Sequence, residues 1–177
     1  MKKQDKIDLL RRGIDGQLIC RCFFTYDDNY FYYYPHAVSD KFLLGQEEDD
    51  FLLDGYCIRK LSQLKKVEIK DDQCGQINRL FGITEGLADP GIDISSWQRI
   101  FEDLSRLDEY IQIQDEIGGS FAIGVIEKVS RDRVYFKPFD ADGVWEEEPW
   151  QIRYSEITSV QWGTRYARYW KRYLERE

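Results

Sequence analysis

The sequence has little of the chemistry that most catalytic centres use. It contains one histidine, His36, which excludes or nearly excludes His-based catalytic triads and multi-histidine metal sites. The Gly-Gly-Ser at residues 118–120 lacks both the spacing and the following lysine of a phosphate-binding loop. Asp140 and Asp142 could form an acid and base pair, but a solvated loop is the simpler interpretation. We therefore expect no catalytic residues, no cofactor and no enzymatic activity.

Cysteine is also scarce, with four residues in the chain. Cys20 and Cys22 are two positions apart, so they share one face if their segment is a strand. Zinc-binding loops usually space cysteine pairs by about two to four residues and add histidine. Small buried hydrophobic side chains are the favoured interpretation, and a zinc site is the alternative. We expect no metal site.

Long hydrophobic runs are absent. No stretch approaches the roughly 20 apolar residues that a membrane-spanning helix requires. The N-terminal segment MKKQDKIDLLRRG is basic but lacks the apolar centre of a signal peptide, because Asp5, Asp8 and Arg11 interrupt it. These features predict a cytoplasmic protein with reduced cysteines and no membrane span.

Positive charge is outnumbered. The chain has 25 Lys and Arg against 33 Asp and Glu, a formal net charge of -8. This charge repels phosphate backbones and disfavours RNA as a partner, although a local basic face could override the total. By contrast, hydrophobic residues make up 42% and aromatic residues 15% of the chain, which is ample apolar surface for a folded core.

Two segments of the chain echo each other. The stretch QIRYSEITSV, residues 151–160, resembles CIRKLSQLKKV, residues 57–67. Other matches keep the same order at offsets of 91 to 94 residues, as between Val38 and Val129. Duplication of one small fold is the favoured explanation, and chance similarity between ordinary strands is the alternative.

The second copy has the pattern of a helix followed by strands. Residues 93–96 offer helix caps, and apolar residues then recur at three and four positions from Trp97 to Leu107. Alternating segments separated by short polar turns predict five strands, at residues 110–114, 121–129, 133–139, 145–154 and 158–162. A helix followed by five short antiparallel strands is the plan of a small barrel.

The first copy repeats this order. A short helix is predicted at residues 3–12, followed by strands at 17–25, 30–34, 42–46, 51–60 and 66–69. Glycine and proline mark residues 82–93 as a linker. The predicted fold class is mainly β. We expect a first barrel over residues 1–81, the linker at 82–93, and a second barrel with a C-terminal amphipathic helix over 94–177.

The turn between the fourth and fifth strands carries a family resemblance. In the second copy it follows the pattern Ile-Arg-x-x-x-Ile, formed by Ile152, Arg153, Ser155, Glu156, Ile157 and Val160. With the preceding order of elements, this pattern resembles an Sm-like domain, and other SH3-like barrels fit it as well. Sm-like domains usually place glycine directly after the arginine. Here Tyr154 stands in that position, and in the first copy Lys60 follows Arg59.

The resemblance implies ring assembly by strand pairing and RNA binding near the pore. The RNA contacts would come from the turn that holds Arg153 and from the loop between strands two and three. That loop would contain Asp132, or Asp140 in a shifted register. Asp140 and Asp142, and the acidic run at residues 47–50 of the first copy, would repel phosphate. RNA binding is therefore the second hypothesis.

Aromatic and arginine residues are the candidates for contact with a partner. Residues 30–34 are all Tyr or Phe, and some of their rings should pack between domains or subunits, with ligand stacking as the alternative. The C-terminal helix predicts an aromatic stripe, from Tyr166 to Leu174, that caps a barrel, and an arginine stripe that is solvated or meets an acidic partner or membrane surface. The candidate binding residues are Tyr32, Arg59, Trp145, Arg153, Tyr154, Arg168 and Arg172.

These observations predict a non-enzymatic, cytoplasmic protein-interaction or assembly module. Its partner is expected to be another protein or a second copy of the chain, since open strand edges can pair with other subunits.

Overall fold

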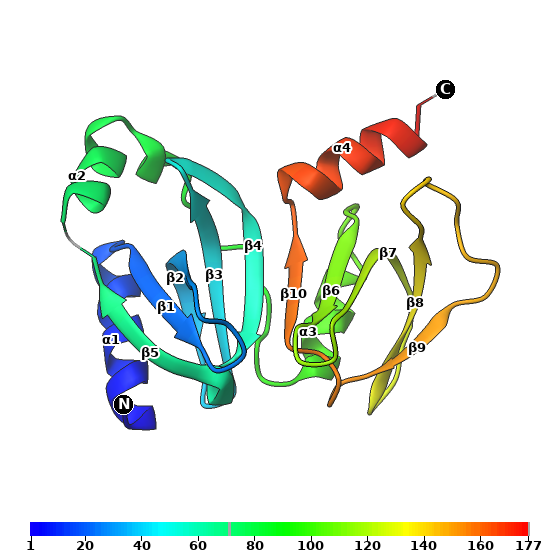
Figure 1. Ribbon diagram of the computed structural model, residues 1–177, viewed down its shortest axis with the longest axis horizontal. Helices are drawn as coiled ribbons and strands as arrows, with labels where there is room; N and C mark the ends of the chain where they lie inside the picture. Colours follow the sequence, from blue (N-terminus) through cyan, green and yellow to red (C-terminus); the bar gives the residue numbers. More distant parts are fainter. Residues whose placement is uncertain (71, 177) are drawn as a thin grey trace. The chain divides into compact units, whose positions relative to one another are not determined.

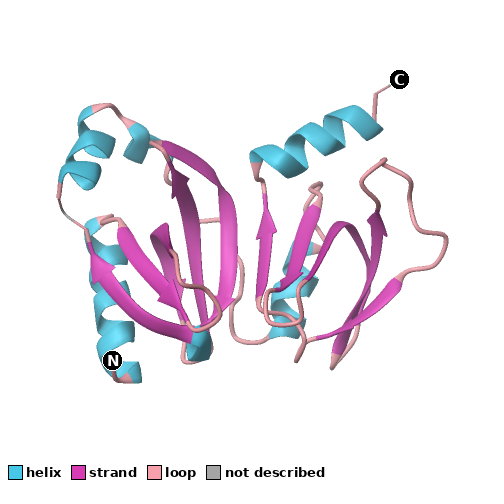
Figure 2. Cartoon of the chain, in the orientation of Figure 1, coloured by secondary structure: helices cyan, strands magenta, loops and turns pink. Residues whose placement is uncertain are grey.

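The chain folds into two compact units, Met1–Ile94 and Ser95–Glu177. The structure is a computed structural model that describes residues 1–70 and 72–176. Both units consist of a curved antiparallel sheet with helices, as Figure 2 shows, so the predicted mainly β class is confirmed. Residues 82–93, the predicted linker, fall within the range of the first unit.

The first unit contains one five-stranded antiparallel sheet in the order β5-β1-β2-β3-β4. Figure 1 shows α1 lying along this sheet. The elements are α1 (Lys3–Gly16), β1 (Cys20–Phe24), β2 (Tyr30–Val38), β3 (Phe42–Asp49), β4 (Leu52–Lys60), the 3-10 helix η1 (Leu61–Gln63), β5 (Leu64–Ile69), α2 (Gln73–Leu80) and the 3-10 helix η2 (Ile83–Gly86).

The second unit has the corresponding order, β10-β6-β7-β8-β9. Its elements are α3 (Trp97–Leu104), β6 (Ile111–Asp115), β7 (Ser120–Val129), β8 (Arg133–Phe139), β9 (Trp150–Arg153), β10 (Ser159–Trp162) and α4 (Arg165–Leu174). The predicted cap of the first helix is present, because the Ser96 hydroxyl accepts a hydrogen bond from the Arg99 backbone N–H.

Both sheets are open. In each unit the fifth strand pairs with the first, and the first four strands follow one another. Within residues 1–70 and 72–176, no ladder joins β4 to β5 or β9 to β10. The fourth and fifth strands are therefore sheet edges within their own units.

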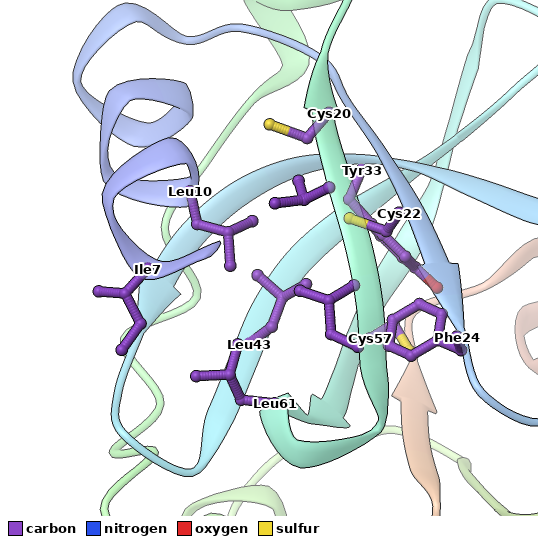
Figure 3. Packing of buried hydrophobic residues seen from close by; sticks show 11 residues of the cluster. Ile7, Leu10, Cys20, Cys22, Phe24, Tyr33, Leu43, Cys57 and Leu61 are labelled. Atoms are coloured by element: carbon purple, nitrogen blue, oxygen red, sulfur yellow. The ribbon is translucent and has the colours of Figure 1, made fainter. Parts of the chain in front are cut away.

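The core of the first unit lies between α1 and the sheet (Figure 3). Ile7 and Leu10 of α1 are buried in this core with Cys20 and Cys22 of β1, which face inward as strand alternation requires. Burial raises the pKa of the Cys20 thiol to about 12. The interpretation of Cys20, Cys22 and Cys57 as buried hydrophobic side chains is confirmed, whereas Cys74 is partly exposed.

The structure differs from the sequence prediction at α2, which was not predicted. Its eight residues begin after Asp72, whose side chain accepts a hydrogen bond from the Cys74 backbone N–H. The helix is fixed to the sheet by Asn78, whose side-chain amide donates to the Tyr34 hydroxyl at 2.9 Å. Both of these side chains are buried.

Several strand boundaries also differ, and the two largest differences are at the end of β2 and the start of β9. β2 continues through Pro35 to Val38. A bulge between Pro35 and Ala37 lets the strand include a residue that has no backbone N–H to donate. The fourth strand of the second unit was predicted to begin at Trp145 but begins at Trp150. Trp145 forms only an isolated bridge with Phe139. The acidic residues 146–148 and Pro149 that follow it do not pair with β8.

The acidic run at residues 47–50 lies at the turn between β3 and β4. The predicted strands at residues 42–46 and 51–60 place the run there as well, and the β2–β3 turn holds Ser39, Asp40 and Lys41. Asp132 does lie between the second and third strands of its unit. None of the helices in the described part of the chain is long and apolar enough to cross a membrane.

Candidate binding surface

α4 is attached to the second unit through one side. Thr164 caps the helix by accepting a hydrogen bond from the Ala167 backbone N–H at 3.1 Å. Ala167 is fully buried, and Trp170 and Leu174 join it against a cluster that includes Tyr110 and Phe139. The ring centroids of Trp170 and Phe139 are 5.1 Å apart. These three positions, spaced by three and four residues, form the inner face of the helix.

Lys171 fastens the same side of α4. Its ammonium donates to the Asp108 backbone carbonyl at 2.9 Å and also contacts the Asp108 carboxylate. Glu175, one turn further along, lies 3.7 Å from the same ammonium. Glu175 also stands near Tyr110, although burial is the main reason that the pKa of this tyrosine rises to about 12. The orientation of the helix is thus set by packing and by charge together.

The opposite side of α4 presents tyrosine and arginine to solvent. Tyr169 is 68% exposed, and Tyr166 and Tyr173 are about half exposed. The guanidinium of Arg172 lies 5.9 Å from the Tyr169 ring, and that of Arg176 lies 3.7 Å from the Tyr173 ring. We call this surface the Tyr–Arg face; it consists of Tyr166, Arg168, Tyr169, Arg172, Tyr173 and Arg176.

The Tyr–Arg face departs from the predicted aromatic stripe. Trp170 and Leu174 do pack inward, but Tyr169 and Tyr173 do not, and the half-exposed Tyr166 meets the Phe121 ring of the sheet edge-on at 6.3 Å. The inward side of the helix could have been predicted from the spacing of Ala167, Trp170 and Leu174 after a capping Thr164. A small residue at the centre of the stripe lets the helix approach the sheet closely and turns the neighbouring tyrosines outward.

The Tyr–Arg face is basic in an acidic chain. Residues 165–177 contain five basic and two acidic side chains, a net charge of +3, so the other 164 residues carry a net charge of -11. This segment would therefore attract an acidic surface that the rest of the chain repels.

A second basic feature is a pocket of about 480 Å³ in the first unit. We call it the lysine pocket; it is lined by Lys3, Lys6, Asp40, Lys41, Phe42, Lys60, Leu61 and Ser62. It lies where α1 meets the β2–β3 turn and the end of β4. The Lys6 ammonium donates to the Leu64 backbone carbonyl at 2.5 Å, which holds this side chain at the pocket. Four lysines face one aspartate here, so the pocket favours anions.

Tyr32 lines a third feature, which we call the acid–aromatic pocket. This pocket measures about 570 Å³ and is lined by Tyr30, Phe31, Tyr32, Glu47, Glu48, Asp49, Asp50, Phe51 and Cys74. Tyr32 lies opposite Glu48 in the β2–β3 ladder. Tyr30 and Tyr32 meet edge to face at 5.2 Å.

Arg59, another candidate, lies in the interior of the first unit. It is 2% exposed, and its guanidinium donates to the Tyr33 and Tyr26 hydroxyls at 2.8 and 2.6 Å. It also lies 4.4 Å from the centre of the Phe31 ring. A direct contact between Arg59 and a partner would require these rings to move.

Arg153 is the last residue of β9, and Tyr154 begins the turn that follows it. The Arg153 side chain is 64% exposed and pairs with Glu156 at 3.7 Å. Tyr154 stacks on Phe101 of α3 at 5.7 Å and donates to the Ser130 carbonyl at 2.7 Å. Burial raises the pKa of Tyr154 to about 12. Tyr154 thus attaches α3 to the sheet, and Arg153 alone of the pair is open to solvent.

The structure brings only some of the candidate residues together. Trp145 meets Phe139 and Tyr110 edge-on in the cluster beneath α4, so it supports the helix that carries Arg168 and Arg172. Arg153 and Tyr154 lie at a different turn of the second unit, and Tyr32 and Arg59 belong to the first unit. Comparison with protein-family models, with curated proteins and with solved structures found no match to this chain.

Arg59 and Arg153, which occupy matching positions in the two similar segments, give a matched pair of stability variants. Arg59→Ala should lower the free energy of unfolding by about 2–4 kcal/mol, because it leaves a buried cavity and two tyrosine hydroxyls without their donor. Arg153→Ala should change it by less than about 0.5 kcal/mol, since an exposed ion pair contributes little. Urea unfolding followed by circular dichroism measures both. Equal losses in the two variants would contradict the interior placement of Arg59.

Proposed function

We propose that the chain is a non-enzymatic, cytoplasmic protein-interaction or assembly module that binds its partner through the Tyr–Arg face. The observation that carries this proposal is a helix with one anchored side and one side that exposes three tyrosines among arginines. Tyrosine and arginine are enriched at the centres of protein interfaces, where they supply much of the binding energy.

The arrangement of the Tyr–Arg face lowers the entropy lost on binding. α4 is held by Ala167, Trp170 and Lys171, so the helix need not order itself around a partner. The guanidinium of Arg176 already rests on the Tyr173 ring, which restricts both long side chains before contact. Preorganised aromatic anchors bind with a smaller loss of side-chain freedom than mobile ones.

We further propose that the two units are small Sm-like or SH3-like barrels that arose by duplication. In support, each unit begins with a helix, and each sheet places its fifth strand beside the first. A short turn also separates the fourth and fifth strands in both units, at η1 and at residues 154–158. The buried, reduced cysteines of the first unit fit a cytoplasmic location.

A photo-crosslinking amino acid at position 169 tests the interaction role. Incorporated in place of Tyr169 in living cells, it should form adducts with a specific protein, because this side chain points away from the helix anchor. The control position is Ile117, which is 69% exposed in the same unit but lies in the β6–β7 turn. Mass spectrometry identifies the adducts. The same adducts at both positions, or none at 169, would contradict the proposal.

RNA binding is the second candidate function, and the lysine pocket is the observation that favours it. The pocket is bordered by the β2–β3 turn and by the end of β4, which correspond to the two regions that an Sm-like domain would use for RNA. Its lysines would contact phosphates, while the net charge of the whole chain opposes binding.

The RNA hypothesis requires a gel shift with single-stranded RNA that weakens as salt is raised. Lys41→Glu should abolish the shift, because it reverses a charge at the mouth of the lysine pocket. Lys65→Glu is the matched control, since this exposed lysine lies on β5 and does not line the pocket. The absence of a shift at low salt, or equal loss in both variants, would exclude RNA binding at this pocket.

A further inference from the structure

The acid–aromatic pocket is a built feature of the first unit. One wall is the β3–β4 hairpin, whose turn residues Asp50 and Phe51 both have positive φ angles, 47° and 66°. This turn carries the partly exposed Phe51 ring to the edge of the pocket. β2 contributes Tyr30, Phe31 and Tyr32, and α2 contributes Cys74. The pocket thus depends on three elements: a strand, a tight hairpin and a helix fixed to the sheet.

The lining of this pocket suits a guanidinium group. Tyr32 and Phe51 offer ring faces and edges, and the neighbouring carboxylates offer acceptors for N–H groups. Glu48 is buried and is held in place by the Phe51 backbone N–H, which donates to its carboxylate at 2.7 Å. Burial raises the pKa of Glu48, as expected for a carboxylate with little access to water.

β2, which carries Tyr30 and Phe31, already holds guanidinium groups against its rings. Arg21 lies 5.0 Å from the centre of the Tyr30 ring. Arg59 lies 4.4 Å from the centre of the Phe31 ring, within the core. Aromatic contact with arginine is therefore a recurring interaction of β2, and the pocket adds carboxylates to it.

We propose that the acid–aromatic pocket binds arginine side chains from the Tyr–Arg face of a second copy of this chain. This inference rests on the proposed function and names the partner. The two surfaces are complementary in charge, because the pocket is lined by four carboxylates and the outer side of α4 carries Arg168, Arg172 and Arg176. Both surfaces are also rich in aromatic rings, which would be removed from water on contact.

The proposed contact joins two different surfaces, so it is heterologous. Each copy carries one α4 and one acid–aromatic pocket, and a contact between copies leaves one of each unused. Association therefore continues head to tail, into a ring if the rotation closes and into a chain if it does not. Because the attraction is between charges at exposed sites, it should weaken as salt is raised.

Two variants of the full chain separate the donor surface from the acceptor surface. The helix variant carries Arg168→Ala and Arg172→Ala, and the pocket variant carries Asp49→Lys and Asp50→Lys. All four substituted side chains are exposed and none belongs to the inner face of α4, so both variants should keep the unfolding midpoint of the native chain to within a few degrees. Asp28→Lys, at an exposed position of the β1–β2 turn, is the control for charge reversal.

Sedimentation equilibrium at low salt is the measurement. The native chain and Asp28→Lys should show an average mass that rises with concentration, and each of the two variants alone should associate at least tenfold more weakly. An equimolar mixture of the two variants should form dimers and nothing larger, because only one native contact is available to each pair.

A native chain that stays monomeric over the whole concentration range would overturn the inference, as would a mixture of variants that does not associate. Occupation of the pocket by the helix of the same chain would give that monomeric result. If the chain is monomeric while the photo-crosslinker at position 169 still captures a different protein, the self-association inference fails and the proposed function stands. If neither experiment gives a contact, both fail.

Discussion

Ala167 determines which side of α4 faces the second sheet. The helix offers four aromatic rings and a leucine, and they cannot all be buried on one side of ten residues. The small side chain of Ala167 allows close approach to the sheet, and Trp170 and Leu174 follow it inward at helical spacing. Tyr169 and Tyr173 are left outside, where Arg172 and Arg176 cover their rings. The exposure of these tyrosines and arginines is thus a consequence of how the helix is anchored.

The echo between the two units does not extend to the chemistry of their arginines. Arg59 lies in the interior of the first unit, where it binds Tyr26, Tyr33 and the face of Phe31. Arg153, at the matching position, is exposed and pairs with a neighbouring glutamate. One sequence pattern therefore stabilises a core in one unit and leaves a solvated side chain in the other. Binding surfaces are to be sought in the parts that differ, namely α2, the β3–β4 hairpin and α4.

The sequence predicted the strands well because alternation of inward and outward residues is a local signal. It did not predict α2, because those eight residues bury only Gly75 and Asn78 and carry a weak apolar repeat. It ended β2 at Tyr34, since a proline usually ends a strand and a bulge cannot be foreseen. The candidate site was predicted in part, because Arg168 and Arg172 are exposed on α4. The exposure of Tyr169 and Tyr173 was not predicted, since the spacing alone does not show which side of the helix packs against the sheet. That choice is made by tertiary contacts with Tyr110 and Phe139.

The central claim is that a partner covers the Tyr–Arg face in the cell. Oxidative footprinting of tyrosine side chains, compared between dilute purified protein and intact cells, tests this claim most directly. Tyr169 and Tyr173 should react readily in the dilute protein and be protected in cells, while the buried Tyr33 and Tyr110 stay unreactive in both. Equal reactivity of Tyr169 and Tyr173 in both samples would contradict the claim.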